Sequence, residues 1–143
     1  MRLLPWGCLL LLVLPLAGMA EGLDYAQTRQ LTERAVALFA DEKIDEGYQA
    51  LKPHWPLPAV EIDNLANQTH NQWPMVRQRF GEPLKMEFVH EARAGESLLR
   101  YVYIQKFERH ALRWVFTFYK PEGQWLVNSV SFDDQLDRLF VVR

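Results

Sequence analysis

The chain has 143 residues, a formal net charge of −2 and a single cysteine, Cys8. Acidic and basic residues are nearly balanced and the densest basic stretch is only Arg77–Arg79, so the basic surface that nucleic-acid binding requires is not expected. Cys8 lies near the N-terminus within an apolar stretch, so neither thiol catalysis nor a disulfide is expected in the domain that follows.

The N-terminus has the order of an export signal. Arg2 precedes the apolar run Leu9–Leu14, and the small-residue segment Ala17–Ala20 provides a cleavage site. The apolar run is too short to cross a hydrocarbon core of ~30 Å, which takes about 20 residues, so no membrane anchor is expected. We therefore predict a signal peptide over residues 1–20 and one domain over residues 21–143. The expected location is a bacterial periplasm, because disulfides are lacking, or otherwise the cell exterior.

Two helices are predicted at the start of the domain. The first should run from about Tyr25 to Ala40, because Asp24 and Gln27 form a capping pair and apolar residues follow at helical spacing. The second is short, begins after a cap at Asp41 and ends at Pro53, since proline cannot donate a hydrogen bond to the preceding turn.

A third helix is predicted from near Pro58 to Phe80, with Gly81 as its C-terminal cap. Its apolar face continues through Pro74. An interior proline costs about 3 kcal/mol and disfavours helical geometry in the residue before it, so we expect a kink or short break near Trp73.

Four strands are predicted in the second half, because the apolar periodicity falls to two residues. They cover about Leu84–Arg93, Ser97–Phe107, Ala111–Tyr119 and Gln124–Phe132. Their connections are short enough to permit only antiparallel neighbours, and a helical turn capped by Asp133 or Asp134 should follow. The predicted fold class is α+β, with the N-terminal helices packed on a four-stranded antiparallel meander.

The third strand indicates which side of the sheet packs on the helices. Its core face should carry Leu112, Trp114, Phe116 and Phe118, and its outward face Arg113, Val115, Thr117 and Tyr119. The first strand should add Leu84, Met86 and Phe88 to the core and turn Lys85, Glu87, Val89 and Glu91 outward. The second strand is apolar or aromatic on both sides, so its facing stays open. One facing gathers Tyr101, Tyr103 and Tyr119 on the open face, where amphipathic rings suit a partner or ligand.

The aromatic run and turn from Trp114 to Val127, following helices, resemble the last hairpin of small exported members of the nuclear transport factor two-like superfamily. The resemblance covers about Asp24 to Phe140 in element order, and its specific match lies in Phe80–Gly81 and Leu112–Phe132. It implies a cone in which helices pack into the concave side of the sheet and often leave a pocket. Members include isomerases, dehydratases, dimerising adaptors and domains without known activity, so the fold alone does not select a function.

The leading functional hypothesis is a non-catalytic exported binding domain. The surface expected to bind consists of Tyr101, Tyr103, Arg113, Thr117 and Tyr119. Arg100 is added to the binding residues because it could enter a cavity together with His90, and such a pair could clamp a carboxylate. This hypothesis rests on an outward register richer in tyrosine than a solvated face usually is. The occupant would be a small apolar ligand or another protein, including a second copy of the chain in a homodimer.

The alternative hypothesis is a pocket enzyme, an isomerase or hydratase for a small hydrophobic molecule. It places His90 on the core face after Phe88, as acid or base, with Arg100 in register with Val102 and Ile104. The simpler interpretation is that both ionisable groups reach solvent at strand ends.

No metal ion or cofactor is expected. A helical metal site needs two histidines three or four residues apart, and no such pair occurs among His54, His70, His90 and His110. Serine hydrolysis is not expected without a Gly-x-Ser-x-Gly elbow. A cystatin-like protease inhibitor has a related architecture, but its Gln-x-Val-x-Gly hairpin is absent from the sequence.

Overall fold

The computed structural model describes residues 19–140, so the predicted signal peptide lies outside the described residues except for Met19 and Ala20. The elements are α1 (Tyr25–Ala40), α2 (Ile44–Leu51), η1 (Lys52–His54), α3 (Ala59–Phe80), β1 (Pro83–Ala94), β2 (Leu98–Phe107), β3 (Ala111–Tyr119), β4 (Leu126–Asp133) and η2 (Leu136–Leu139), where η marks a 3₁₀ turn. Within this described part, no helix is both long and apolar enough to cross a membrane.

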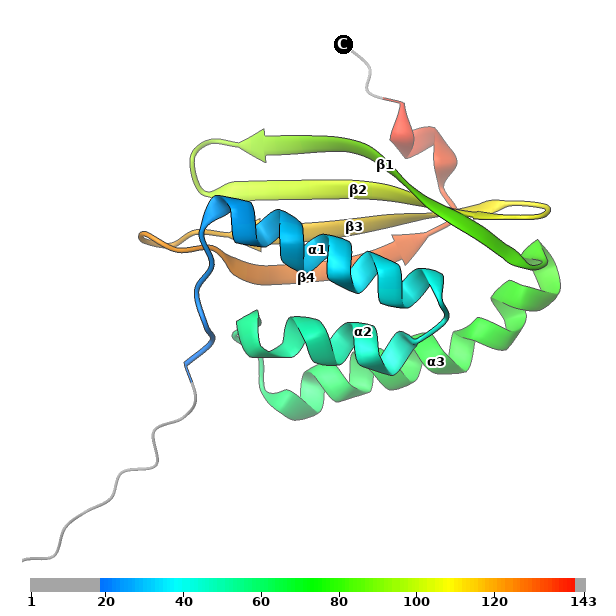
Figure 1. Cartoon of the computed structure of the whole chain (residues 1–143), viewed down its shortest axis with the longest axis horizontal. Coiled ribbons are helices and arrows are strands. Elements are labelled where there is room, and N and C mark those ends of the chain that lie inside the picture. The colour runs from blue at the N-terminus through cyan, green and yellow to red at the C-terminus, as the bar shows by residue number, and fades with distance from the viewer. Residues whose placement is uncertain (1–18, 141–143) are drawn as a thin grey trace, which may run out of the picture.

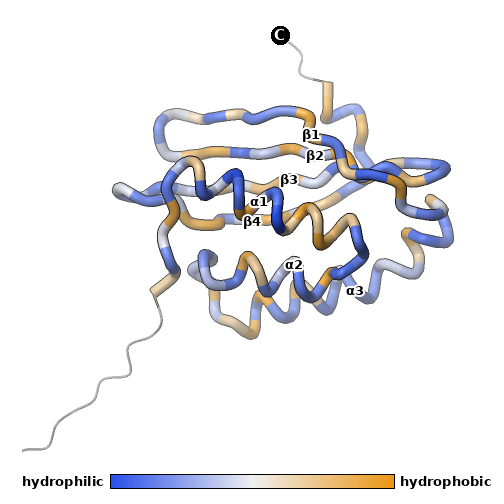
Figure 2. The backbone as a smooth tube through the Cα atoms, viewed as in Figure 1, coloured by the Kyte–Doolittle hydropathy of each residue, from blue (hydrophilic) through white to orange (hydrophobic). Residues whose placement is uncertain are grey.

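The fold is α+β, as predicted, with the helices on one side of the sheet (Figure 1). The strands are hydrogen-bonded in the order β1-β2-β3-β4, and each neighbouring pair is antiparallel. The predicted meander is therefore confirmed. The helices alternate between hydrophilic and hydrophobic residues along their length (Figure 2), which is typical of helices that bury one side against a sheet.

The start of α1 confirms the predicted capping pair. The Gln27 backbone N–H donates to Asp24 Oδ1 at 2.8 Å, and the Asp24 N–H donates to Gln27 Oε1 at 2.9 Å. Asp41, by contrast, ends α1 and does not cap α2. The residue after it, Glu42, has a left-handed backbone with φ of 61°.

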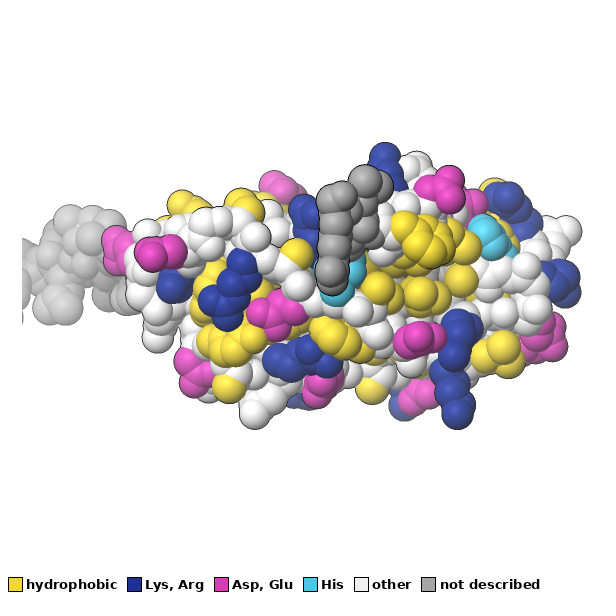
Figure 3. Space-filling view, turned by 90° about the horizontal axis from the view of Figure 1, so that it is seen from above, with side chains coloured by type: hydrophobic (Ala, Val, Ile, Leu, Met, Phe, Trp, Pro, Cys, Tyr) yellow, Lys and Arg dark blue, Asp and Glu magenta, His cyan; other side chains and the backbone are white. Residues whose placement is uncertain are grey.

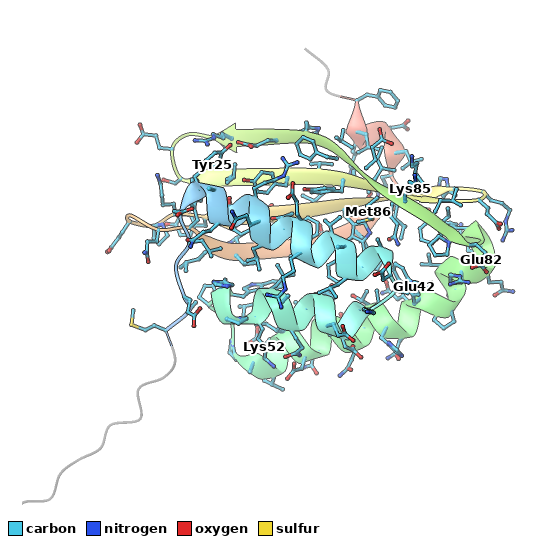
Figure 4. The ribbon with its side chains drawn as sticks, in the orientation of Figure 1. Tyr25, Glu42, Lys52, Glu82, Lys85 and Met86 are labelled. Atoms are coloured by element: carbon cyan, nitrogen blue, oxygen red, sulfur yellow. The ribbon has the colours of Figure 1, made fainter. Side chains whose placement is uncertain are left out.

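The side chain of Glu42 explains why a residue other than glycine occupies this turn. Its carboxylate accepts a hydrogen bond from Trp73 Nε1 at 2.9 Å and forms an ion pair with Arg77, both on α3. Figure 4 shows Glu42 at the turn between α1 and α2, on the side facing α3. These contacts join the turn to α3 and offset the strain of the left-handed backbone, which is of order 1–3 kcal/mol.

Helix α3 continues through Pro74, so the predicted short break is absent. Pro74 and the preceding turn at His70 are exposed, and the carbonyl that loses its partner to the proline can therefore bond to water. Figure 1 shows α3 curving over its C-terminal part toward the start of β1. Gly81 follows with φ of 90°, confirming the predicted glycine cap.

The core face of β3 is as predicted: Leu112, Trp114, Phe116 and Phe118 are buried against the helices. The register settles the open question of β2, because Tyr101 pairs with Phe116 and Tyr103 with Trp114. Side chains of directly paired residues share a face, so Tyr101 and Tyr103 belong to the core. The expectation that they lie on the open face is wrong.

A bulge in β1 changes the facing of its second half. Phe88 pairs with Tyr103, whereas His90 pairs with Val102, so Val89 is an extra residue. Before the bulge, Met86 and Phe88 face the helices as predicted, but Leu84 is exposed. After it, His90 faces away from the helices and Glu91 faces them, which reverses both predictions.

Glu91 has a partner on the helix side. The hydroxyl of Tyr25, at the start of α1, donates to the two carboxylate oxygens of Glu91 at 2.9 and 2.8 Å. Figure 4 shows Tyr25 at the end of α1 that lies beside the sheet. This contact attaches the first turn of α1 to the edge strand.

Candidate functional site

We call the side of the sheet opposite α1, α2 and α3 the outer face. Four of the six residues predicted to bind lie on it: Arg100, Arg113, Thr117 and Tyr119. The other two, Tyr101 and Tyr103, lie on the helix side. The sequence therefore predicted the facing of β3 correctly, but it misplaced the two tyrosines of β2 and expected Arg100 to enter a cavity on the helix side.

The two misplaced tyrosines are part of the packing between α1 and the sheet. The Tyr101 hydroxyl is 2.8 Å from Thr28 Oγ1 on α1. The Tyr103 hydroxyl is buried without a hydrogen-bond partner among the described residues, and burial raises the pKa of Tyr103 to about 12. Neither ring is available to a ligand on the outer face.

The interior between helices and sheet is filled by aromatic side chains. The ring of Trp114 stacks on Phe39 with centroids 4.5 Å apart and lies 4.9 Å from the ring of Phe132. Gln105 accepts a hydrogen bond from Trp114 Nε1 at 2.9 Å, and its amide nitrogen lies 3.4 Å from the Phe39 carbonyl oxygen. The space that the cone resemblance would leave for a ligand is occupied here by the protein's own side chains.

Arg113 has a structural partner on the outer face. Its Nε donates to Asp133 Oδ1 at 3.1 Å and its Nη2 to Asp133 Oδ2 at 2.6 Å, a bidentate pair between β3 and the end of β4. Asp133 Oδ1 also accepts from the Gln135 N–H at 2.9 Å, which holds the chain as it enters η2. We therefore assign Arg113 to stability and not to the site.

Asp133→Asn is expected to lower the free energy of unfolding by about 1–2 kcal/mol at neutral pH, because it removes a charge-assisted pair. The Arg113 hydrogen bonds hold the pKa of Asp133 below its ordinary value. A carboxylate with a depressed folded pKa stabilises the fold above its unfolded pKa of about 3.9, and that contribution disappears as the pH falls through the folded value.

Urea unfolding from neutral pH to about pH 2.5 measures this dependence. The variant should lose less stability than the unmodified protein over the acidic part of the range. The matched control is Asp134→Asn, whose carboxylate is exposed and reaches only His110, at 4.0 Å. An unchanged acid dependence in Asp133→Asn would contradict the assignment.

The other three predicted residues come together near the β1–β2 hairpin. Thr117 pairs with Arg100, and Tyr119 pairs with Leu98. On the other side of β2, the edge strand β1 places Ala92 opposite Arg100 and Ala94 opposite Leu98.

The small side chains of Ala92 and Ala94 lie beside the long ones of Arg100 and Leu98, and this difference in size leaves a hollow on the outer face. The hollow has a volume of about 200 Å³ and is lined by Ala92, Arg93, Ala94, Leu98, Leu99, Arg100 and Thr117. We call it the Arg100 pocket. The sequence pattern does not mark Ala92 and Ala94, since their effect depends on which residues they face across the strands.

The Arg100 pocket has one available charge. Its lining contains no Asp or Glu, and Arg100 forms no ion pair with any residue that the structure describes. Arg93 also lines the pocket, but it pairs with Leu99 on the helix side, where its Nε lies 3.4 Å from Glu91 Oε1 and its guanidinium 4.6 Å from the centroid of the Tyr25 ring. The positive potential of the pocket therefore comes mainly from Arg100.

An apolar rim continues from the pocket across the sheet. Leu98 is 40% exposed and its partner Tyr119 is 43% exposed, and Leu126 of β4 pairs with Tyr119 on the far side. In the middle of the outer face, the paired Val102 and Val115 are buried. Figure 3, a view from above Figure 1, shows hydrophobic side chains among Lys, Arg, Asp and Glu side chains on both sides of the grey atoms.

His90, the candidate acid or base, lies on the outer face beside Val102 and not in the interior. It has no hydrogen-bond partner among the side chains that the structure describes, so nothing there orients the imidazole for proton transfer. The described residues also contain no group of three or more His, Cys, Asp or Glu side chains that could hold a metal ion.

Comparison with known proteins found no matching family, no matching curated protein and no matching solved structure. The resemblance to the nuclear transport factor two-like superfamily therefore stays a prediction.

Proposed function

We propose that this protein is an exported, non-catalytic binding domain of the nuclear transport factor two-like type, which binds a small, partly apolar ligand on the outer face of its sheet. The observation that carries the proposal is the Arg100 pocket with its apolar rim. Ligand sites in proteins are concave and mostly apolar, with a few polar groups that fix the orientation of the ligand. The pocket has this composition, and three of the residues predicted to bind, Arg100, Thr117 and Tyr119, lie at it or on its rim.

A small ligand is favoured over a protein partner because the exposed apolar side chains of the outer face cover only a small area. A stable protein interface buries about 800 Å² on each partner, usually around a continuous apolar centre. Here the central pair Val102 and Val115 is already buried, and the exposed apolar side chains Leu98 and Tyr119 lie toward one end of the face. This distribution fits a ligand that contacts a few side chains better than it fits a homodimer through the whole sheet.

The positions of His90 and Arg100 do not support the pocket-enzyme alternative. It required His90 and Arg100 to enter a cavity on the helix side, and both residues lie on the outer face.

The contacts of the first residues support the export part of the proposal. The Glu21 N–H donates to the Pro53 carbonyl at 2.8 Å, and Leu23 pairs with Trp125 through two backbone hydrogen bonds. Removal of residues 1–20 would leave these contacts in place, so cleavage before Glu21 is compatible with the fold of the described residues.

The test is titration of the exported protein with N-phenyl-1-naphthylamine, a neutral apolar probe whose fluorescence rises on binding. We expect saturable binding that Leu98→Glu weakens by about tenfold or more, since a charge on the rim opposes an apolar ligand. The matched control is Leu84→Glu, because Leu84 is 60% exposed on β1 but lies outside the pocket lining.

Two results would contradict the proposal. One is the absence of saturable binding. The other is equal loss of binding in the Leu84 and Leu98 variants, which would place the probe elsewhere or show that it binds without a specific site.

A further inference from the structure

The Arg100 pocket offers a ligand one cation and one hydroxyl, both on the central strands of the sheet. Arg100 lies on β2 and Thr117 lies directly opposite on β3. An arginine guanidinium presents a planar fork of N–H donors that matches the two oxygens of a carboxylate, and a threonine hydroxyl can donate one further hydrogen bond. With no acidic side chain in the lining, the chemistry of this end of the pocket suits an anion with paired oxygens, such as a carboxylate.

The backbone of the two central strands at this site is already used by the sheet. β2 pairs with β1 on one side and β3 on the other, and β3 pairs with β2 and β4. The peptide groups of these central strands are therefore committed to the ladder and do not face the ligand. A peptide segment needs partners for its own N–H and C=O groups, and one lying over β2 and β3 would leave them largely unpaired.

The remaining contacts are apolar and follow a line across the sheet. Ala94, Leu98, Tyr119 and Leu126 succeed one another through cross-strand pairs on β1, β2, β3 and β4. Neighbouring strands lie about 4.8 Å apart, so this row spans roughly 14 Å. An alkyl chain of medium length fits along this row. The pocket volume of about 200 Å³ is below the 300–1,000 Å³ typical of sites for drug-sized ligands, so a bulky ligand is not expected.

We propose that the Arg100 pocket binds a free aliphatic carboxylic acid of medium chain length, with its carboxylate on Arg100 and Thr117 and its alkyl chain on Leu98 and Tyr119. This inference rests on the proposed function and names the ligand class of the same site. The carboxylate is held by Arg100 through a bidentate pair, and Ala92 provides the space that lets it reach the guanidinium. The alkyl chain leaves water and packs on the apolar rim, which favours binding through the hydrophobic effect.

The experiment compares octanoate with 1-octanol as competitors of N-phenyl-1-naphthylamine, using the exported protein. Octanoate should displace the probe at a concentration about tenfold lower than 1-octanol, because only octanoate carries the charge that Arg100 pairs with. Arg100→Gln should lower the affinity for octanoate by about tenfold and leave the affinity for 1-octanol unchanged. Arg100→Lys should have an intermediate affinity for octanoate, since an ammonium keeps the charge but lacks the planar fork of donors.

Two further variants separate charge from space. Ala92→Leu fills the pocket without changing charge and should weaken octanoate. Lys106→Gln removes a cation from the same strand and the same face, away from the pocket lining, and should have no effect. Arg100 is exposed and without an ion pair, so its variants should unfold at the same temperature as the unmodified protein; this is checked by circular dichroism.

The outcomes distinguish this inference from the proposed function. Saturable probe binding with equal affinity for octanoate and 1-octanol would overturn the carboxylate assignment and leave the proposed function standing. An acetylated tripeptide ending in a free leucine carboxylate that binds as tightly as octanoate, with the same loss in Arg100→Gln, would replace the free acid by a peptide terminus. Absence of probe binding would overturn both.

Discussion

Trp114→Ala is expected to lower the free energy of unfolding by about 4 kcal/mol, the largest single effect that we predict. Trp114 is fully buried, its ring stacks on Phe39 and packs on Phe132, and its Nε1 donates to Gln105. The substitution therefore opens a cavity and also leaves a buried amide oxygen without its donor. Equilibrium unfolding in urea, followed by far-ultraviolet circular dichroism, measures the change.

The control for Trp114→Ala is the next residue on the same strand. Val115 is also buried but faces the outer side of the sheet, outside the aromatic core. Val115→Ala should cost only about 1–2 kcal/mol, since fewer atoms are removed. Equal effects of the two substitutions would mean that the helices do not pack on the face that carries Trp114, and the description of the core would have to be abandoned.

Local sequence signals were sufficient for the fold class. The capping pair Asp24 and Gln27, the helix-ending Gly81 and the short strand connections each act within a few residues, so they can be interpreted without knowing the three-dimensional structure. The alternation in β3 was equally clear, because all of its large aromatic residues except Tyr119 lie on one face. These signals agree with one another, and the architecture followed from them.

The facing of β2 required information that no local pattern carries. Tyr101 and Tyr103 alternate with Val102 and Ile104, and either set could form a core face. The choice depends on which residues of β3 they meet, and pairing with Phe116 and Trp114 places both tyrosines in the interior. A shift of one residue in this pairing would have turned them outward, as the sequence analysis expected.

His90 was misplaced for a different reason. Strict alternation from Phe88 predicts that His90 faces the helices, and one extra residue at Val89 reverses this. Bulges of this kind leave a weak trace in a single sequence because the extra residue has no required identity. The same bulge brings Glu91 to Tyr25, so the contact that attaches α1 to β1 depends on it.

The candidate site was predictable only in part. Thr117 and Tyr119 were predicted on the outward face from the alternation in β3, and they share one end of the outer face. Arg100 was expected to enter a cavity on the helix side, and its pairing with Thr117 places it on the outer face instead. The pocket itself arises from Ala92 and Ala94 on another strand, whose small size matters only next to Arg100 and Leu98. A hollow that forms because small side chains lie beside long ones cannot be predicted from a sequence until the cross-strand pairs are known.

Gly47→Ala gives the second large effect, and its sign is opposite to the one that helix propensity predicts. Gly47 lies within α2, where alanine is favoured over glycine by about 1 kcal/mol. A β-carbon at this position would meet the ring of Phe39, with Cδ1 at 2.7 Å and Cζ at 2.8 Å. We expect the substitution to lower the free energy of unfolding by about 2 kcal/mol, because overpacking a well-packed core costs typically 1–3 kcal/mol.

The Phe39 ring cannot move away easily, because it is fully buried between Gly47 and the stacked Trp114. This gives a direct test by a double-mutant cycle with Phe39→Leu, which removes the ring atoms that meet the new methyl group. Phe39→Leu alone should destabilise the protein, but Gly47→Ala should then cost less, giving a favourable coupling of about 1 kcal/mol or more. Glu46→Ala, on the exposed side of the same helix, is the control for propensity and should change stability by less than about 0.5 kcal/mol. If Gly47→Ala stabilises the protein to a similar extent in both backgrounds, α2 does not approach Phe39 as described, and the close contact of α2 with the aromatic core is refuted.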